Sequence, residues 1–307
     1  MTLISDIILP VFGLVVFGFV AGRAGWIKPA AIEGLSAFVF TFAIPVMLFR
    51  AVATAELPSH VPLAFLLAYY GSTLVLFLAA LALGRQLKLT MLGASVFAMS
   101  ATYSNVVLLG IPLVVATLGA EGTVPLFIIV STHAAIMFVM TTLFAELRSG
   151  SLASLPLQTV KVLARNMIVV GLLAGLTLNL AGLSLPATLD NMAAYLGSAA
   201  LPCAVFSMGA SISLYRITGD LTRISLAVML KNGVHPLLVW LVCDPLLELP
   251  RAWTAVAVVL AACPSGINAY LFANRYQAGV AATASVVVMS TLLSIPLMSL
   301  LLLLLFR

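Results

Sequence analysis

Long apolar stretches separated by short polar segments make up almost the whole chain. A helix needs about 20 mostly apolar residues to cross the hydrocarbon core of a bilayer, and ten stretches come near that length. They are predicted at residues 4–22, 34–53, 62–83, 92–116, 124–145, 162–181, 190–213, 224–247, 252–274 and 279–306. The pattern therefore predicts an all-α membrane protein with ten transmembrane helices.

The amino-acid composition also indicates an integral membrane protein. Of the 307 residues, 63% are hydrophobic and only 7% are charged, and the mean hydropathy is +1.23. A soluble domain could not cover its surface with so few polar residues. The three cysteines, Cys203, Cys243 and Cys263, fall in apolar stretches without a metal-binding spacing. That placement favours packing roles over a disulfide or a metal site.

The charges of the predicted loops alternate along the chain and predict an orientation. Loops after odd-numbered helices carry the basic residues Arg23, Lys28, Arg85, Lys88, Arg148, Lys161, Arg216, Arg223 and Arg275. Loops after even-numbered helices carry Glu56, Glu121, Asp190, Asp244 and Glu248, with Arg251 as their one basic residue. Basic loops tend to stay on the cytoplasmic side of a membrane, so both termini are expected outside.

Five predicted helices precede a central segment and five follow it. Because five is odd, the second half must enter the membrane in the opposite orientation, which predicts an inverted repeat. We therefore expect a first repeat at 1–147, a cytoplasmic linker at 148–161 and a second repeat at 162–307. Pro45 in the second helix and Pro202 in the seventh stand in similar local sequences, which agrees with a 5+5 repeat.

Two polar interruptions lie near the middle of the fourth and ninth predicted helices. The first is Ser-Asn-Val-Val-Leu-Leu-Gly-Ile-Pro at 104–112, and the second is Cys-Pro-Ser-Gly-Ile-Asn-Ala-Tyr at 263–270. Broken helices at membrane depth persist only where protein buries them or where they line a cavity. One break in each half indicates a secondary transporter with its binding site near the midplane, where the two broken helices would cross.

Asn105 and Asn268 are the leading candidates for substrate binding, because an amide offers both a donor and an acceptor. Each could instead tie its own helix to a neighbour, but their matching depth in the two breaks favours a site. The free N–H groups and positive dipole ends of broken helices favour anions. Adjacent substrate-binding candidates are Ser104, Ser265, Gly266 and Tyr270, and the residues expected to shape the breaks are Gly110, Pro112 and Pro264.

Three titratable residues, Lys231, His235 and His133, are predicted inside the membrane. Lys231 and His235 are four residues apart and so share one helix face. Lys231 either extends its ammonium to the interface or takes part in substrate binding by attracting an anion. His133 and His235 are candidates for proton coupling, since histidine titrates near neutral pH. The alternative for His133 is a neutral ring hydrogen-bonded inside the bundle.

Several kinds of chemistry are missing from the predicted membrane core. All nine acidic residues map to loops or helix ends, so no carboxylate is expected at the bilayer centre. That argues against an antiporter with paired aspartates and against a membrane enzyme that holds Mg²⁺ on aspartate clusters. No catalytic triad, phosphate loop or metal-ligand spacing stands out, so we expect no enzyme activity, cofactor or metal. Gly171 and Gly175 predict a close helix–helix approach.

Three motifs resemble the auxin efflux carrier family, above all its bacterial members. They are Phe-x-x-Pro-x-x-Leu-Phe at 42–49, Ser-Asn-x-x-x-x-Gly-Ile-Pro-Leu at 104–113 and Cys-Pro-x-x-x-Asn-Ala-Tyr at 263–270. The resemblance covers essentially the full chain and implies a fold shared with sodium/bile-acid symporters. In that fold the first, second, sixth and seventh helices form a scaffold, and the others form a transport domain. The resemblance also places Asn105 and Asn268 where the fourth and ninth helices cross.

The sequence as a whole is interpreted as a secondary transporter that moves small organic anions by alternating access. The resemblance implies carboxylates such as malonate, malate or auxin-like acids, and a multi-pass protein of the bacterial inner membrane. Coupling to H⁺ or to Na⁺ and assembly as a homodimer are both compatible with the sequence. The alternatives are a sodium-coupled symporter of the bile-acid type and a membrane sensor that binds a ligand without transporting it.

Overall fold

The computed structural model describes residues 9–55, 63–146, 166–215 and 217–305. Most of these residues are helical, and the part of the chain that is described contains no β-strand, only one isolated β-bridge. The predicted all-α class is therefore confirmed. The predicted linker 148–161 lies outside the described residues.

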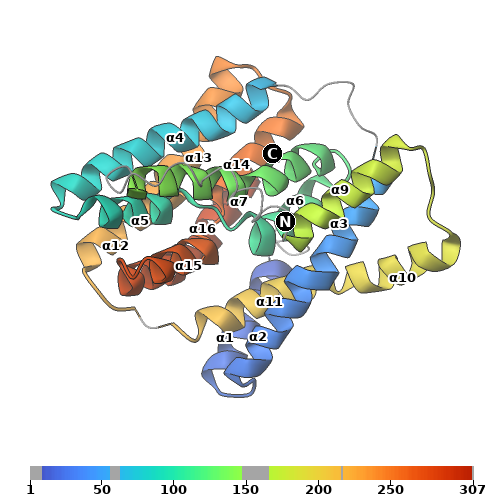
Figure 1. Cartoon of the computed structure of the whole chain (residues 1–307), viewed down its shortest axis with the longest axis horizontal. Helices are drawn as coiled ribbons and strands as arrows, with labels where there is room; N and C mark the ends of the chain where they lie inside the picture. Colours follow the sequence, from blue (N-terminus) through green and yellow to red (C-terminus); the bar gives the residue numbers. More distant parts are fainter. Residues whose placement is uncertain (1–8, 56–62, 147–165, 216, 306–307) are drawn as a thin grey trace. The chain divides into compact units, whose positions relative to one another are not determined.

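The helices follow the predicted apolar stretches in order (Figure 1). Helices named η are π-helical turns. The bounds are α1 Leu9–Arg23, α2 Pro29–Phe38, η2 Val39–Ala43, α3 Ile44–Ala53, α4 Leu63–Gln86, α5 Met91–Thr102, η3 Val106–Gly110, α6 Ile111–Leu118, α7 Thr123–Glu146, α9 Met167–Leu180, α10 Ala187–Ser198, α11 Ala200–Ile212, α12 Leu221–Met229, η5 Leu230–Val234, α13 His235–Leu241, η6 Val242–Leu246, α14 Arg251–Ala262, α15 Ile267–Arg275 and α16 Val280–Leu305.

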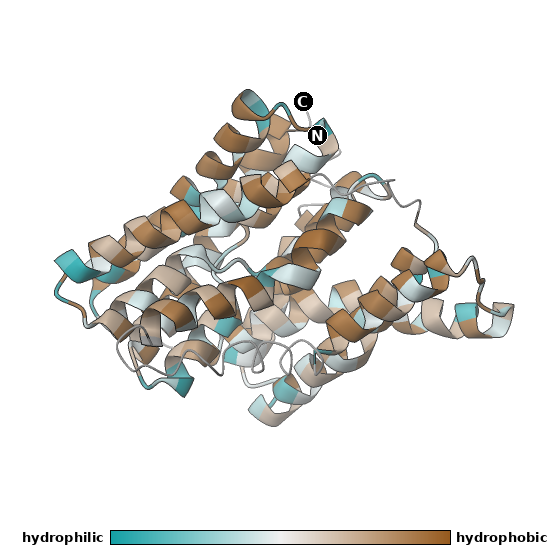
Figure 2. Ribbon diagram, turned by 45° about the horizontal axis from the view of Figure 1, so that its top comes forward, coloured by the Kyte–Doolittle hydropathy of each residue, from teal (hydrophilic) through white to brown (hydrophobic). Residues whose placement is uncertain are grey.

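Six continuous helical segments of the described chain are long and apolar enough to cross a membrane. They are Pro29–Ala53, Leu63–Gln86, Thr123–Ala145, Ala187–Ile212, Leu221–Leu246 and Val280–Leu305. Hydrophobic residues cover most sides of these helices in Figure 2, as expected for helices surrounded by protein and lipid. The remaining apolar helices are shorter, so the ten-span inverted repeat stays a prediction.

The described chain forms two compact units that cut across its two halves. Unit 1 comprises the described residues of Met1–Ser59, Val107–Thr132 and Val160–Leu214, and unit 2 comprises those of His60–Val106, His133–Thr159 and Tyr215–Arg307. The first, second, sixth and seventh predicted helices all fall in unit 1, as the family resemblance implies for a scaffold. The third, eighth, ninth and tenth fall in unit 2, while the fourth and fifth are divided between the units.

Small residues bring helices of unit 1 into backbone contact. A Cβ atom on Gly18 of α1 would lie 2.1 Å from the carbonyl oxygen of Phe206 in α11, and one on Gly209 of α11 would lie 1.9 Å from the oxygen of Val15. Helices α9 and α3, which run side by side in Figure 1, meet in the same way. Cβ atoms on Gly171 and Gly175 would lie 2.5 and 2.4 Å from the backbone oxygens of α3. The predicted close approach at these two glycines is confirmed.

Polar contacts add to this packing at one end of α3. The Arg50 guanidinium donates from Nε to Asp190 Oδ1 at 2.6 Å and from a terminal nitrogen to Oδ2 at 3.0 Å. The Asn179 side-chain amide donates to the carbonyl oxygens of Val52 and Ala55 at 2.9 and 2.8 Å. The two-pronged ion pair and the amide together fix α9 and α10 against the end of α3.

Side chains cap several helices where the apolar pattern begins. The Thr90 hydroxyl accepts from Gly93 N at 3.1 Å at the start of α5. The Asp220 carboxylate accepts from Thr222 N at 2.9 Å at the start of α12, and the Asn166 side chain accepts from Ile168 N at the start of α9. Each cap satisfies a backbone N–H that has no partner within its own helix.

Three π-helical turns precede prolines. Pro45, Pro112 and Pro236 each stand second in the α-helix that follows η2, η3 or η5. Proline has no N–H to donate to the carbonyl four residues earlier, and a π-turn changes the bonding pattern at that point. The π-turn η5, which precedes Pro236, contains Lys231.

The glycine contact between α1 and α11 predicts a position-specific loss of stability. The Gly18→Ala variant should lower the free energy of unfolding by about 1–3 kcal/mol, because the new methyl group overlaps the Phe206 carbonyl. Gly13→Ala on the same helix is the matched control, since a Cβ there meets nothing within 4 Å. Thermal melting in detergent would measure both variants, and equal melting temperatures would contradict the contact.

Candidate functional site

The two helix breaks pair with each other in unit 2. Ser104, after α5, and Ser265, after α14, form an antiparallel bridge. Asn105 N donates to Pro264 O at 2.8 Å, and Gly266 N donates to Tyr103 O at 3.0 Å. The breaks predicted from the Asn, Gly and Pro pattern thus meet as two short extended segments.

This pairing redirects backbone donors away from the two helix ends. If α5 continued past Thr102, the N–H groups of Ser104 and Asn105 would donate to the carbonyls of Ser100 and Ala101. Asn105 N instead crosses to Pro264 O, and Ser104 N donates to His133 Nε2 at 3.1 Å. In a site with little access to water, such exchanged partners are what allow the backbone to leave the helix.

His133, from α7, lies next to the bridge among aromatic rings. Its ring centroid is 4.8 Å from that of Tyr103, 6.0 Å from Tyr69 and 6.3 Å from Tyr70. Because Ser104 N is a donor, His133 Nε2 must be its acceptor, and the ring hydrogen of this tautomer sits on Nδ1. The histidine therefore supports the break directly.

Polar atoms around the bridge are buried without a hydrogen-bond partner among the described residues. They are Ser104 Oγ, Ser265 Oγ and His133 Nδ1, and all three residues are fully buried. The buried Tyr69 OH lies close to Ser104. Unpaired buried polar groups are costly and uncommon, so these three atoms make the bridge the candidate site.

The two asparagines differ in their surroundings. The Asn105 side chain is buried, whereas Asn268, in the first turn of α15, is exposed. Asn268 Nδ2 donates to Tyr103 OH at 2.6 Å, so the two breaks are tied by side chains as well as by backbone. Asn268 thus contacts the first break at Tyr103, whereas its meeting with Asn105 at one binding site stays a prediction.

Gly266 permits the close approach of the breaks. A Cβ atom there would lie 2.7 and 2.8 Å from two carbons of the Tyr103 ring and 3.3 Å from Ser104 O. The Tyr103 hydroxyl is held by Asn268, so the ring cannot move away without breaking that bond. The sequence prediction named Gly266 as a binding residue, and its observed geometry gives it a shaping role.

Lys231 and His235 form a second polar group beside the α14 break. Both side chains are fully buried. Lys231 Nζ donates to Ala261 O at 2.6 Å and to His235 Nδ1 at 3.2 Å. Lys231 therefore does not extend to an interface but turns inward, to the end of α14.

Other predicted residues lie away from the bridge. The Tyr270 ring packs against Tyr215 with centroids 4.9 Å apart. Gly110 and Pro112 belong to unit 1, in and just after η3, where the chain has already returned to helix. The break itself lies at 103–105, so the part of Gly110 and Pro112 in shaping it stays a prediction.

Four residues that contact the site were not predicted from the sequence. Tyr69, Tyr70 and Thr73 lie on α4, and Ser290 lies on α16, where its Oγ accepts from Ser265 N at 3.0 Å. Tyr69, Tyr70 and Thr73 fall within two turns of one helix. This local cluster of hydroxyl groups is visible in the sequence and could have indicated a polar site. Ser290 sits among many similar hydroxyls, and nothing in the pattern distinguishes it.

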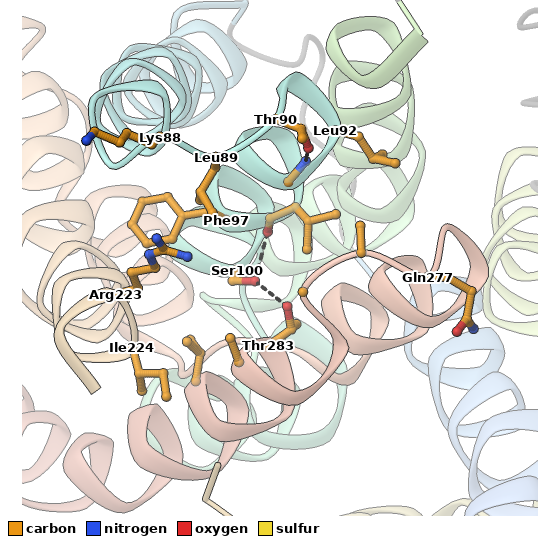
Figure 3. Close-up of a pocket in the computed structure, with 16 residues that line it drawn as sticks. Lys88, Leu89, Thr90, Leu92, Phe97, Ser100, Arg223, Ile224, Gln277 and Thr283 are labelled. Carbon is orange, nitrogen blue, oxygen red and sulfur yellow. Dashed lines mark hydrogen bonds between the residues drawn. The ribbon is translucent and has the colours of Figure 1, made fainter. Parts of the chain in front are cut away.

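A pocket of about 530 Å³ lies elsewhere in unit 2, between α5, α12 and α16 (Figure 3). Its walls are mostly apolar, and Ser100 Oγ contacts Thr283 Oγ1 at 3.3 Å in its interior. The Lys88 side chain points away from these hydroxyls in the same view. None of the predicted site residues lines this pocket, although Ser100 is one helical turn before Ser104.

No group of three or more His, Cys, Asp or Glu side chains in the described part of the chain could hold a metal ion. The polar groups at the paired breaks and beside them are hydroxyl, amide and imidazole groups and the Lys231 amino group. Long apolar helices around such a polar break are the arrangement of a membrane transporter.

Comparison with known proteins agrees with this class. Residues 3–302 match the family described as membrane transport protein, so the chain belongs to that family. The resemblance to auxin efflux carriers is thereby confirmed, and the protein is a transporter rather than an enzyme.

One curated relative is similar over nearly its whole length. It is a protein of Rhizobium meliloti (strain 1021) named "Putative malonate transporter". The two sequences are 26% identical over 296 residues, which cover 95% of this chain and 92% of the relative.

The tight approach at Gly266 predicts a strong steric effect. Gly266→Ala should disturb the bridge, because the methyl group would overlap the Tyr103 ring. Gly233→Ala, in η5, is the control, since its Cβ would meet nothing within 4 Å. Melting temperature and limited proteolysis of purified protein should show a loss for Gly266→Ala only. A Gly266→Ala variant as stable as Gly233→Ala would show that the breaks do not pack this closely.

Proposed function

We propose that this protein is a secondary transporter of small organic anions and that the anion binds at the paired breaks of unit 2. The unpartnered buried groups at the Ser104–Ser265 bridge carry the proposal. In water-free surroundings such groups gain most from a ligand that supplies the missing hydrogen bonds. Small carboxylates suit them, because a carboxylate accepts several donors at once.

The charges near the breaks favour an anion over a cation. Lys231 contributes the one ammonium found beside the described site, and no carboxylate forms an ion pair with it there. Helix α15 begins at Ile267, directly after the second break, and no side chain caps its N-terminus. The positive end of its dipole therefore adds to the attraction for negative charge.

The substrate candidates follow from the site and from the relative. Malonate and malate are short dicarboxylates that could bridge the hydroxyl group of the breaks and Lys231. The Rhizobium relative is named for malonate, and auxin-like acids are the alternative from the family resemblance. We place the protein in the bacterial inner membrane.

Transport would proceed by alternating access around the paired breaks. In an inverted repeat, two similar halves of opposite orientation can exchange conformations, which opens the site to either side in turn. His133 and His235 are the candidates for proton coupling. Protonation of His133 at Nε2 would break its bond to Ser104 N, so a proton there would act on the break itself.

Uptake into proteoliposomes tests the function. Labelled malonate, malate and indole-3-acetate would be offered with and without imposed sodium and pH gradients. Saturable flux of one anion, absent from protein-free vesicles, is expected. A requirement for sodium would identify a sodium-coupled symporter. Ligand binding by folded protein without any flux would contradict transport and indicate a sensor.

Substitution of the two asparagines is expected to impair flux. Hydrogen bonds to a charged group contribute about 1.5–3 kcal/mol, so Asn105→Ala and Asn268→Ala should each lower kcat/KM by at least about tenfold. Asn191→Ala, at an exposed position of α10, is the matched control. Normal flux in both site variants, with folding confirmed by gel filtration, would show that the anion does not bind at these two residues.

A further inference from the structure

The most unusual group in the described chain is the Lys231 ammonium. Lys231 is fully buried in a helical segment long and apolar enough to span a membrane. The ion pairs of the described residues are Arg50 with Asp190 and Arg223 with Asp220, so Lys231 has no carboxylate partner among them. An ionisable side chain inside a membrane segment indicates function unless a partner explains it.

The partner of Lys231 is a helix end whose backbone donors have been removed. Pro264 has no N–H for the carbonyl of Leu260. Ser265 N donates to Ser290 Oγ, and Gly266 N donates to Tyr103 O, so the carbonyls of Ala261 and Ala262 also lose their helical donors. Lys231 Nζ supplies the donor for Ala261 O at 2.6 Å and sets a positive charge at the negative end of α14.

A chain of hydrogen bonds fixes the ammonium in this position. Thr73 Oγ1 donates its one hydrogen to Tyr69 O at 2.7 Å, so it can only accept from His235 Nε2 at 3.0 Å. The ring hydrogen of His235 is therefore on Nε2, and Nδ1 is left to accept from Lys231 Nζ at 3.2 Å. Lys231 is thus held at two of its three N–H bonds by groups from α13 and α14.

In carriers with broken helices, the carbonyl ends of half-helices bind the coupling cation from solution. We propose that Lys231 is a tethered cation that takes this position at the end of α14. The site is then complete for an anion without a dissolved sodium or potassium ion. This inference rests on the proposed anion transport and adds to it the cation requirement of the same site.

The first test measures malonate binding to the purified protein in sodium, potassium and choline chloride of equal ionic strength. The three dissociation constants should agree within about twofold. Binding at least about tenfold weaker in choline than in sodium would overturn the proposal. This arm uses the unaltered protein, so it stands even if a variant fails to fold.

The second test removes the tether and needs no substrate. Lys231→Ala leaves a space beside Ala261 O that ethylammonium can enter, whereas Lys231→Met fills the space with an uncharged chain of similar length. Ethylammonium at about 50 mM should raise the melting temperature of Lys231→Ala by a few degrees and leave Lys231→Met unchanged. Ethanol is the uncharged control ligand.

The outcomes separate the two proposals. Equal melting temperatures of the unaltered protein and Lys231→Met, or no ethylammonium effect on Lys231→Ala, would overturn the tethered cation. Rescue by ethylammonium with no anion bound in any medium would support the tethered cation and contradict the proposed substrate class.

Discussion

Every backbone N–H and C=O group in a membrane segment needs a partner that is not water, and this requirement organises the site. Once Pro264 interrupts α14, the donors and acceptors near it must be paired elsewhere. Asn105, Gly266, Ser290, His133 and Lys231 supply those partners. The residues proposed to bind the anion and the residues that stabilise the breaks therefore overlap, since Asn105, Gly266 and Lys231 belong to both sets.

The two units meet this requirement by different means. In unit 1 glycines let α1 approach α11, and α3 approach α9, until backbone atoms touch. In unit 2 the helices are interrupted, and hydroxyl, imidazole and ammonium groups replace the lost backbone bonds. Close backbone packing suits a rigid element, whereas exchangeable polar bonds suit the ligand binding and release that we propose for unit 2.

Much of this could be predicted from the chain itself. The order of the helices follows from the length of the apolar stretches, and the breaks follow from polar residues beside Gly and Pro. The sequence did not show that the chain is helical again at Gly110 and Pro112. The π-turn η3 accommodates the missing N–H of Pro112, so the helix continues through this proline. Ser290 could not be found, because one hydroxyl among many on an apolar helix gives no sign of its partner. Tyr69 and Thr73 form a visible polar cluster on α4, but the sequence does not show which helix this cluster contacts. The inward turn of Lys231 likewise depends on carbonyls that only the three-dimensional break exposes.

The bridge between Ser104 and Ser265 joins segments that are far apart in the sequence through two backbone bonds and one side-chain bond. Neither segment has a stable conformation of its own, since each depends on the other for its partners. A change at Tyr103 therefore alters what is tolerated at Gly266 and Asn268, and their effects on stability will not add. Over evolutionary time such positions can change only in concert, so related sequences should show correlated substitutions between the two breaks.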